Sequence, residues 1–236
     1  MHSGLIAQTM IDWENLPTYN TIMAVAAGVG LFLVAQLGRE ILADPVEVSV
    51  AGYSIAFGIL GFLLTTTGLH MTLTWPLAPA FPFDNIVFGE TALAFGVLLL
   101  AAAFFGWRRG EALLAAPDPI RKMEKIARPT AVFIGFFGFA MIAIGAAGVR
   151  YQLFAAPPEE PFAGWWFSEY PWVEAIFISG LWALIGVGAI TLAIGVYRPG
   201  AWYRTAGYCL SVSGIVLAVF GVINYFSHIG LIVETM

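Results

Sequence analysis

The chain has 236 residues, of which 60% are hydrophobic and only 11% are charged, and its formal net charge is -5. Because a soluble domain carries about 25% charged residues, this composition excludes a soluble globular protein and indicates an integral membrane protein. It contains no basic stripe that could bind nucleic acid. The single cysteine, Cys209, excludes an intrachain disulfide and any CxxC metal or redox motif.

Six stretches of the chain are long and apolar enough to cross a lipid bilayer, which requires about 20 residues each. In chain order they are residues 20–38, 49–71, 86–107, 130–150, 172–196 and 206–230. Turn-forming pairs such as Asp44-Pro45 and Pro199-Gly200 separate them. We therefore predict an all-α fold, a polytopic membrane helix bundle of six transmembrane helices that forms a single transmembrane domain over residues 1–236.

The basic residues predict the orientation of this bundle, because lysine and arginine accumulate in cytoplasmic loops. Nine of the ten lie in three alternate connections: Arg39, then Arg108, Arg109, Arg121, Lys122, Lys125 and Arg128, then Arg198 and Arg204. Arg150 is the exception. Both termini and the loops 71–85 and 151–171 are thus expected to face outwards (N-out/C-out), in a multi-pass protein of the cell membrane, plasma or inner.

Two pairs of spans share a pattern that predicts a parallel repeat of helical hairpins. The aligned pairs are Gly58/Gly135, Gly61/Gly138, Phe62/Phe139, Gly68/Gly145, Glu90/Glu174, Gly96/Gly180 and Leu100/Leu184. The repeat units would be residues 49–107 and 130–196, with extra helices at 20–38 and 206–230. Small residues also allow membrane helices to approach closely, so chance similarity of glycines is the alternative explanation.

Five ionisable side chains fall at a similar depth near the outer ends of their spans: His70, Glu90, Arg150, Glu174 and His228. Counting 1.5 Å per residue places them within about one helical turn of one another. Such groups are costly to desolvate, so they are expected to face the bundle and to find partners. In the simplest interpretation they are rim residues that extend to the headgroups, with Arg150 and Glu174 forming a structural ion pair.

In a second interpretation His70, His228 and Glu90, together with Asp84, ligate a metal ion. Imidazole with carboxylate suits copper, zinc or iron, and two histidines with one carboxylate leave coordination positions open. Asn224 and Thr66 lie one helical turn below the two histidines and would orient them. In a third interpretation His70 and His228 are the axial ligands of one haem b, with Arg150 near its propionates.

The second outer loop, residues 154–172, is acidic and aromatic. Trp165, Trp166, Tyr170 and Trp172 are expected to form a belt at the membrane interface. The alternatives are a lid over the polar side chains or a docking surface for other membrane subunits.

The stretch "GLHMTLTWPLAPAFPFDNIVFGETALAFGVLLLAAAF" contains a His-Trp-Pro, an Asp-Asn and a Gly-Glu element. It resembles the signature region of a family of uncharacterised prokaryotic multi-spanning membrane proteins, a domain of unknown function, mainly over residues 65–105. The resemblance implies that these elements belong together. It implies no activity, cofactor or partner.

The leading functional hypothesis is an integral membrane protein with an extracytoplasmic metal or redox site at the outer end of the bundle, alone or as a subunit of a larger membrane complex. One alternative is a non-catalytic accessory subunit whose polar rim is structural. The other is a transporter of a small solute or ion. The sequence does not decide whether the protein is an enzyme.

Overall fold

The computed structural model describes residues 16–79, 81–155, 158–164 and 169–236. Over these residues the chain is helical and contains no strand. Six helical segments are long and apolar enough to cross a membrane: α1 (Asn20–Ala43), α2 (Val50–Thr74), the composite segment Pro82–Leu114, α6 (Pro119–Tyr151), α8 (Pro171–Tyr197) and α9 (Ala201–Thr235). The predicted all-α bundle of six spans is confirmed, and the protein is a multi-pass membrane protein.

The third span is interrupted by two π-helical stretches. It begins with α3 (Pro82–Asp84) and continues through η1 (Asn85–Glu90), α4 (Thr91–Phe105), η2 (Gly106–Gly110) and α5 (Glu111–Leu114). A π-helical turn inserts an extra residue and rotates the side chains beyond it, and such turns are frequent at functional sites. The apolar run alone does not predict either stretch.

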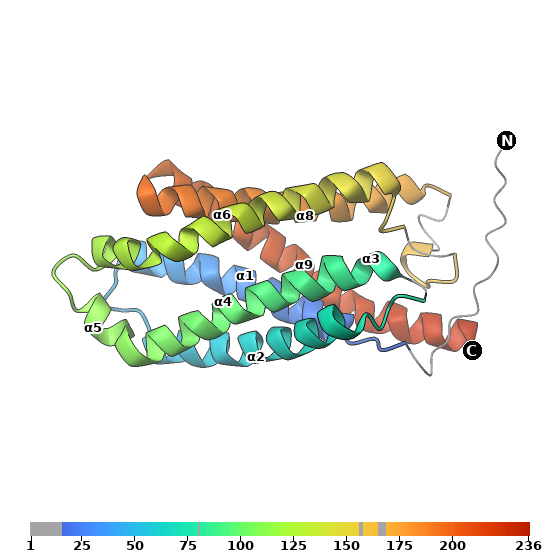
Figure 1. The fold of residues 1–236 in the computed structure, drawn as a ribbon, viewed down its shortest axis with the longest axis horizontal. Helices are drawn as coiled ribbons and strands as arrows, with labels where there is room; N and C mark the ends of the chain where they lie inside the picture. The colour runs from blue at the N-terminus through green and yellow to red at the C-terminus, as the bar shows by residue number, and fades with distance from the viewer. Residues whose placement is uncertain (1–15, 80, 156–157, 165–168) are drawn as a thin grey trace.

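The six spans form three pairs (Figure 1). α1 packs along α9 in the middle, α2 packs along α4 on one side, and α6 packs along α8 on the other. The middle pair joins its neighbours through contacts of α8 with α9 and of α1 with α2. The two hairpins that the sequence predicts as repeat units thus lie on opposite sides of the extra helices.

The described parts of the connections between spans lie at the two ends of the bundle. One end carries α5, and the other carries α3 and the C-terminus (Figure 1). His70 is in the last two turns of α2, which leads to α3. We call the end that carries α3 the outer end and the end that carries α5 the inner end, after the orientation predicted from the basic residues. That orientation itself stays a prediction.

Glycines hold each helix pair close together. In α1, a Cβ atom on Gly28 would meet the backbone nitrogen of Ala218 in α9. In α2, a Cβ on Gly61 would lie 2.9 Å from the carbonyl oxygen of Gly96 in α4. Close approach of this kind supplies the van der Waals packing that drives helix association in lipid.

The hairpins differ in the register of their glycine contacts. A Cβ atom on Gly138 of α6 would lie 2.8 Å from the carbonyl oxygen of Gly186 in α8. A Cβ atom on Gly180, in contrast, would have no atom within 4 Å. Gly96, the aligned partner of Gly180, is in tight contact with α2 instead. The internal repeat therefore stays a prediction.

Replacing Gly28 with alanine is expected to lower the stability of the protein by about 1–3 kcal/mol, because the added methyl group would force the α1 and α9 backbones apart. Thermal unfolding of the purified protein in detergent measures this. The matched control is Gly180→Ala in α8, where nothing lies within 4 Å of the new methyl group. Equal unfolding temperatures for the two variants would contradict the close packing of Gly28 against α9.

Candidate functional site

A cavity of about 770 Å³ lies inside the bundle and is lined by residues of all six spans. This volume falls within the range of about 300–1,000 Å³ that is usual for sites that bind small molecules. Most lining side chains are aliphatic or aromatic, among them Leu31, Phe95, Phe137, Trp182 and Leu217. The cavity is therefore suited to an apolar molecule.

One face of α1 lines the cavity along the whole length of that helix. Its lining residues recur every three or four positions and include Asn20, Ala24, Ala27, Leu31, Val34, Gly38 and Ile41. At 1.5 Å per residue, Asn20 and Ile41 are about 30 Å apart, which is close to the thickness of the hydrocarbon core of a bilayer. A volume of about 770 Å³ spread over about 30 Å gives a mean cross-section of about 25 Å². That is enough for one extended hydrocarbon chain.

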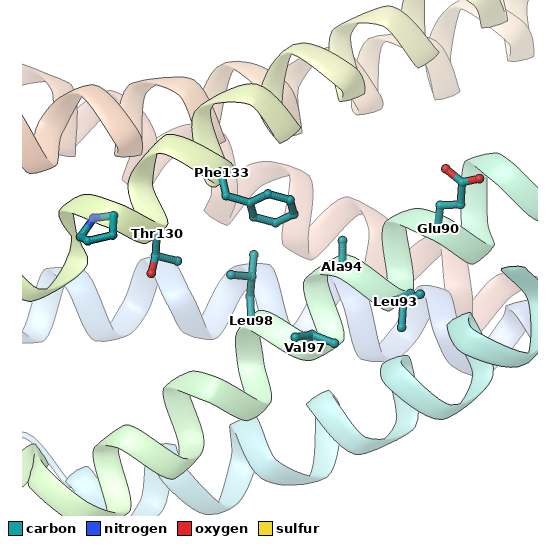
Figure 2. Close-up of a pocket in the computed structure, with 8 residues that line it drawn as sticks. Glu90, Leu93, Ala94, Val97, Leu98, Thr130 and Phe133 are labelled. Carbon is teal, nitrogen blue, oxygen red and sulfur yellow. The ribbon is translucent and has the colours of Figure 1, made fainter.

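A hollow of about 600 Å³ between α4 and α6 lies beside this cavity (Figure 2). Leu98 and Thr130 line both spaces, so the two adjoin. Over their fully described lengths, α4 and α6 are not among the helix pairs that pack together. Since both helices are long and apolar enough to cross the membrane, the hollow lies on a side of the bundle that would face lipid, and we call it the side entrance.

Glu90 lies at the outer edge of this entrance. It is the last residue of η1 and is exposed, and Figure 2 shows its carboxylate directed towards the space between α4 and α6. Leu98 of α4 and Phe133 of α6 also point into that space. Glu90 therefore lines the entrance.

Aromatic contacts close the outer end of the bundle between its two hairpins. The ring of Phe88 in η1 lies 6.0 Å from that of Trp182 in α8, and both residues line the cavity. Closer to the outer end, the ring of Phe83 in α3 packs edge-on against that of Phe154, with the ring centroids 6.4 Å apart. These pairs bring α3 and η1 against the α6/α8 hairpin, although α4 stands apart from it.

The two histidines contact neighbouring residues at the start of α1. The hydroxyl group of Tyr19 lies 2.7 Å from Nδ1 of His70, and Nδ2 of Asn20 lies 3.3 Å from Nε2 of His228. Burial raises the pKa of Tyr19, so its hydroxyl group stays protonated beside His70. The sequence places both histidines at the same depth but does not reveal these partners, which come directly before the first apolar run.

The other residues of the predicted metal site are distributed differently. Asp84 ends the short helix α3 and is half-buried. Thr66 donates its hydroxyl hydrogen bond to the backbone carbonyl of Phe62 at 2.9 Å. Asn224 lines the cavity near its outer end.

Within the described part of the chain, no three His, Cys, Asp or Glu side chains lie close enough together to hold a metal ion. The metal ion and the haem b therefore stay predictions.

Arg150 and Glu174 are both close to the outer end, as expected. The guanidinium group of Arg150 lies over the ring of Tyr151, 5.3 Å from its centroid. Glu174 is in the first turn of α8 and is half-buried. The ion pair between these two residues stays a prediction.

The described part of the second outer loop packs against α9. The carboxylate of Glu160 accepts hydrogen bonds from the backbone N–H groups of Phe162 and Gly164, both at 3.0 Å, and from that of Ala163. Pro161 then contacts Gly230, just beyond His228. Of the predicted aromatic belt, Tyr170 and Trp172 are exposed, whereas Trp165 and Trp166 lie outside the described residues.

Asn85 organises the corner that connects α2 to the third span. This fully buried residue accepts a hydrogen bond from the backbone N–H of Leu77 at 3.2 Å through Oδ1. Its Nδ2 donates to the carbonyl oxygen of Pro82 at 3.1 Å. Both bonds stabilise the turn before η1, so the Asp-Asn element has a structural role at this position.

Comparison with known proteins identifies the family. The family described as "Protein of unknown function (DUF981)" matches residues 17–230. The chain belongs to this family. The resemblance seen at residues 65–105 is thereby confirmed and extends over nearly the whole chain. No curated protein and no solved structure matches this DUF981 chain.

Replacing Asn85 with alanine is expected to lower the stability of this DUF981 protein by about 1–3 kcal/mol, because the N–H group of Leu77 would be left buried without its partner. Thermal unfolding in detergent is again the measurement. Ile86→Ala is the matched control, since Ile86 is the next residue and its side chain is exposed. An Asn85→Ala protein as stable as the control would show that the corner does not depend on these two bonds.

Proposed function

We propose that this protein binds one long apolar chain, taken up from the bilayer, inside its bundle. The observation that carries the proposal is the apolar cavity, which extends along α1 for about the thickness of the hydrocarbon core. The hollow between α4 and α6 supplies a route from the lipid. A chain of this kind could enter sideways without crossing the polar headgroups.

The energetics of an empty cavity favour an occupant. The side chains that line an empty apolar space lose packing contacts on that side, so an apolar occupant is favoured over an empty space. Water does not fill such a space well, because an ordered water needs two or more polar partners.

The same lining disfavours an ion as the solute. Transfer of an ion into an apolar interior costs several kcal/mol even after relaxation unless it is paired. The middle of the cavity offers side chains such as Leu31, Phe137 and Leu217. Of the transport hypotheses, an apolar solute therefore fits this interior better than an ion does.

Photolabelling with a hexadecane chain that carries a diazirine tests the proposal. In membranes, the probe is expected to label Met141, which lines the cavity and is only 2% exposed, as well as Phe136 on the lipid-facing side of the same helix. An excess of unlabelled hexadecane should abolish labelling of Met141 and leave that of Phe136. Labelling confined to Phe136 would overturn the proposal.

Filling the cavity provides a matched pair of variants. Ala27→Phe places a ring in the cavity from α1 and is expected to lower the labelling of Met141 several-fold. Ala140→Phe adds the same ring to an exposed position of α6 and should leave the labelling unchanged. Equal labelling of Met141 in both variants would contradict binding inside the bundle.

A further inference from the structure

We propose that the bound chain ends in a hydroxyl group, which hydrogen-bonds to the side-chain oxygen of Asn20 at the outer end of the cavity. This inference rests on the proposed function and specifies the chemical class of the ligand. It would be a long-chain alcohol or phenol, such as a prenol, a fatty alcohol or a hydroquinone with an apolar tail.

The unused hydrogen-bonding capacity of Asn20 carries the inference. Asn20 lines the cavity, and its Nδ2 is held by Nε2 of His228 at 3.3 Å. Its Oδ1 is buried and has no hydrogen-bond partner within the described part of the chain. A buried acceptor without a partner costs about 1–3 kcal/mol, and most such groups in folded proteins are paired. A small rotation of the Asn20 side chain, whose oxygen is buried here, would bring this oxygen to the cavity, where a donor on the ligand would satisfy it.

The contact with His228 determines which atom of the amide is left for the ligand. When Nε2 accepts from Asn20, the proton of the neutral imidazole is on Nδ1, which lies 3.5 Å from the hydroxyl of Ser227. Oδ1 of Asn20 is then the atom left over, and an oxygen of this kind only accepts. The site therefore favours a hydroxyl over an ether, an ester or a ketone, which have no proton to donate.

Four other buried side-chain oxygens without partners exist among the described residues, on Thr65, Thr72, Ser179 and Ser211. None of them lines the cavity. In the described part of the chain, Asn20 alone combines an unpaired buried side-chain oxygen with a position among the lining residues.

Polar side chains at the inner end of the cavity already pair with one another. The hydroxyl of Tyr203 donates to Oε1 of Glu124 at 3.1 Å, and both residues line the cavity. Tyr53, which also lines it, lies beside the carboxylate of Glu40 of α1. The polar end of a ligand would have to break these pairs in order to bind there, so the structure assigns it to the outer end.

Competition against the diazirine-bearing hexadecane probe at Met141 tests the inference. The competitors are hexadecan-1-ol and hexadecyl methyl ether. The ether has a methyl group in place of the hydroxyl proton of the alcohol. The two compounds are compared at equal measured concentrations in the membrane. The alcohol is expected to displace the probe at about a five-fold lower concentration, as one net hydrogen bond predicts. Equal potency of the two compounds in the native protein would overturn the inference and leave the proposed function intact. Absence of any competable label at Met141 would overturn the proposed function itself.

Two variants locate the hydroxyl group. Asn20→Leu is expected to abolish the preference for the alcohol while the ether competes as before, and Tyr203→Phe at the inner end should keep the preference. Loss of the preference in Tyr203→Phe but not in Asn20→Leu would place the hydroxyl at the inner end and contradict the inference. The comparison of alcohol with ether in the native protein decides the question even if Asn20→Leu does not fold.

Discussion

Close contact of backbones at glycines is the constraint on which the rest of this structure depends. Gly28 against α9, Gly61 against α4 and Gly138 against α8 bring each helix pair so close that no side chain fits at the crossing. Lipid tails are as apolar as leucine, so helices in a membrane associate through this kind of packing rather than through the hydrophobic effect. The three pairs are consequently tight, whereas the space between the pairs is not packed in the same way.

The cavity follows from that difference. Where α1, α4, α6 and α8 face one another across the bundle, their lining side chains do not fill the interior, and about 770 Å³ remains. The helices on the two sides of the entrance, α4 and α6, belong to different pairs and do not pack together over their described lengths. An opening between pairs therefore leaves the contacts within each pair undisturbed. Uptake of a chain from the bilayer would then need little rearrangement of the helices.

Sequence reasoning succeeded where only length and hydropathy matter. The six spans, the all-α class and the family follow from runs of about 20 apolar residues and from the stretch around His70. Counting residues also places His70 and His228 at a similar depth. It does not give the direction in which each side chain points, because this depends on the rotation of each helix about its axis. Tyr19 and Asn20, the actual partners of the two histidines, could therefore not be identified from the sequence.

The candidate site was harder to predict because its signal is a lack of packing. Ala27, Leu31 and Phe137 are ordinary residues of apolar helices, and nothing in their identity indicates that they face a cavity. Polar and charged residues, in contrast, are rare in such a sequence and can be recognised from it directly. Glu90 lies at the entrance, and His228 holds Asn20 at one end of the cavity. Both are thus adjacent to the cavity.

The stretch that carries the family resemblance builds the outer boundary of the cavity. Buried Asn85 holds the turn, and the π-helical segment η1 follows it at once. Because a π-helical turn rotates the residues beyond it, Phe88 can meet Trp182 across the bundle while Glu90, two residues later, faces the entrance. If this segment were a regular α-helix, the side chains of Phe88 and Glu90 would point in different directions relative to each other. The polar and proline-rich corner therefore has a structural role, because it sets the geometry at the start of the third span.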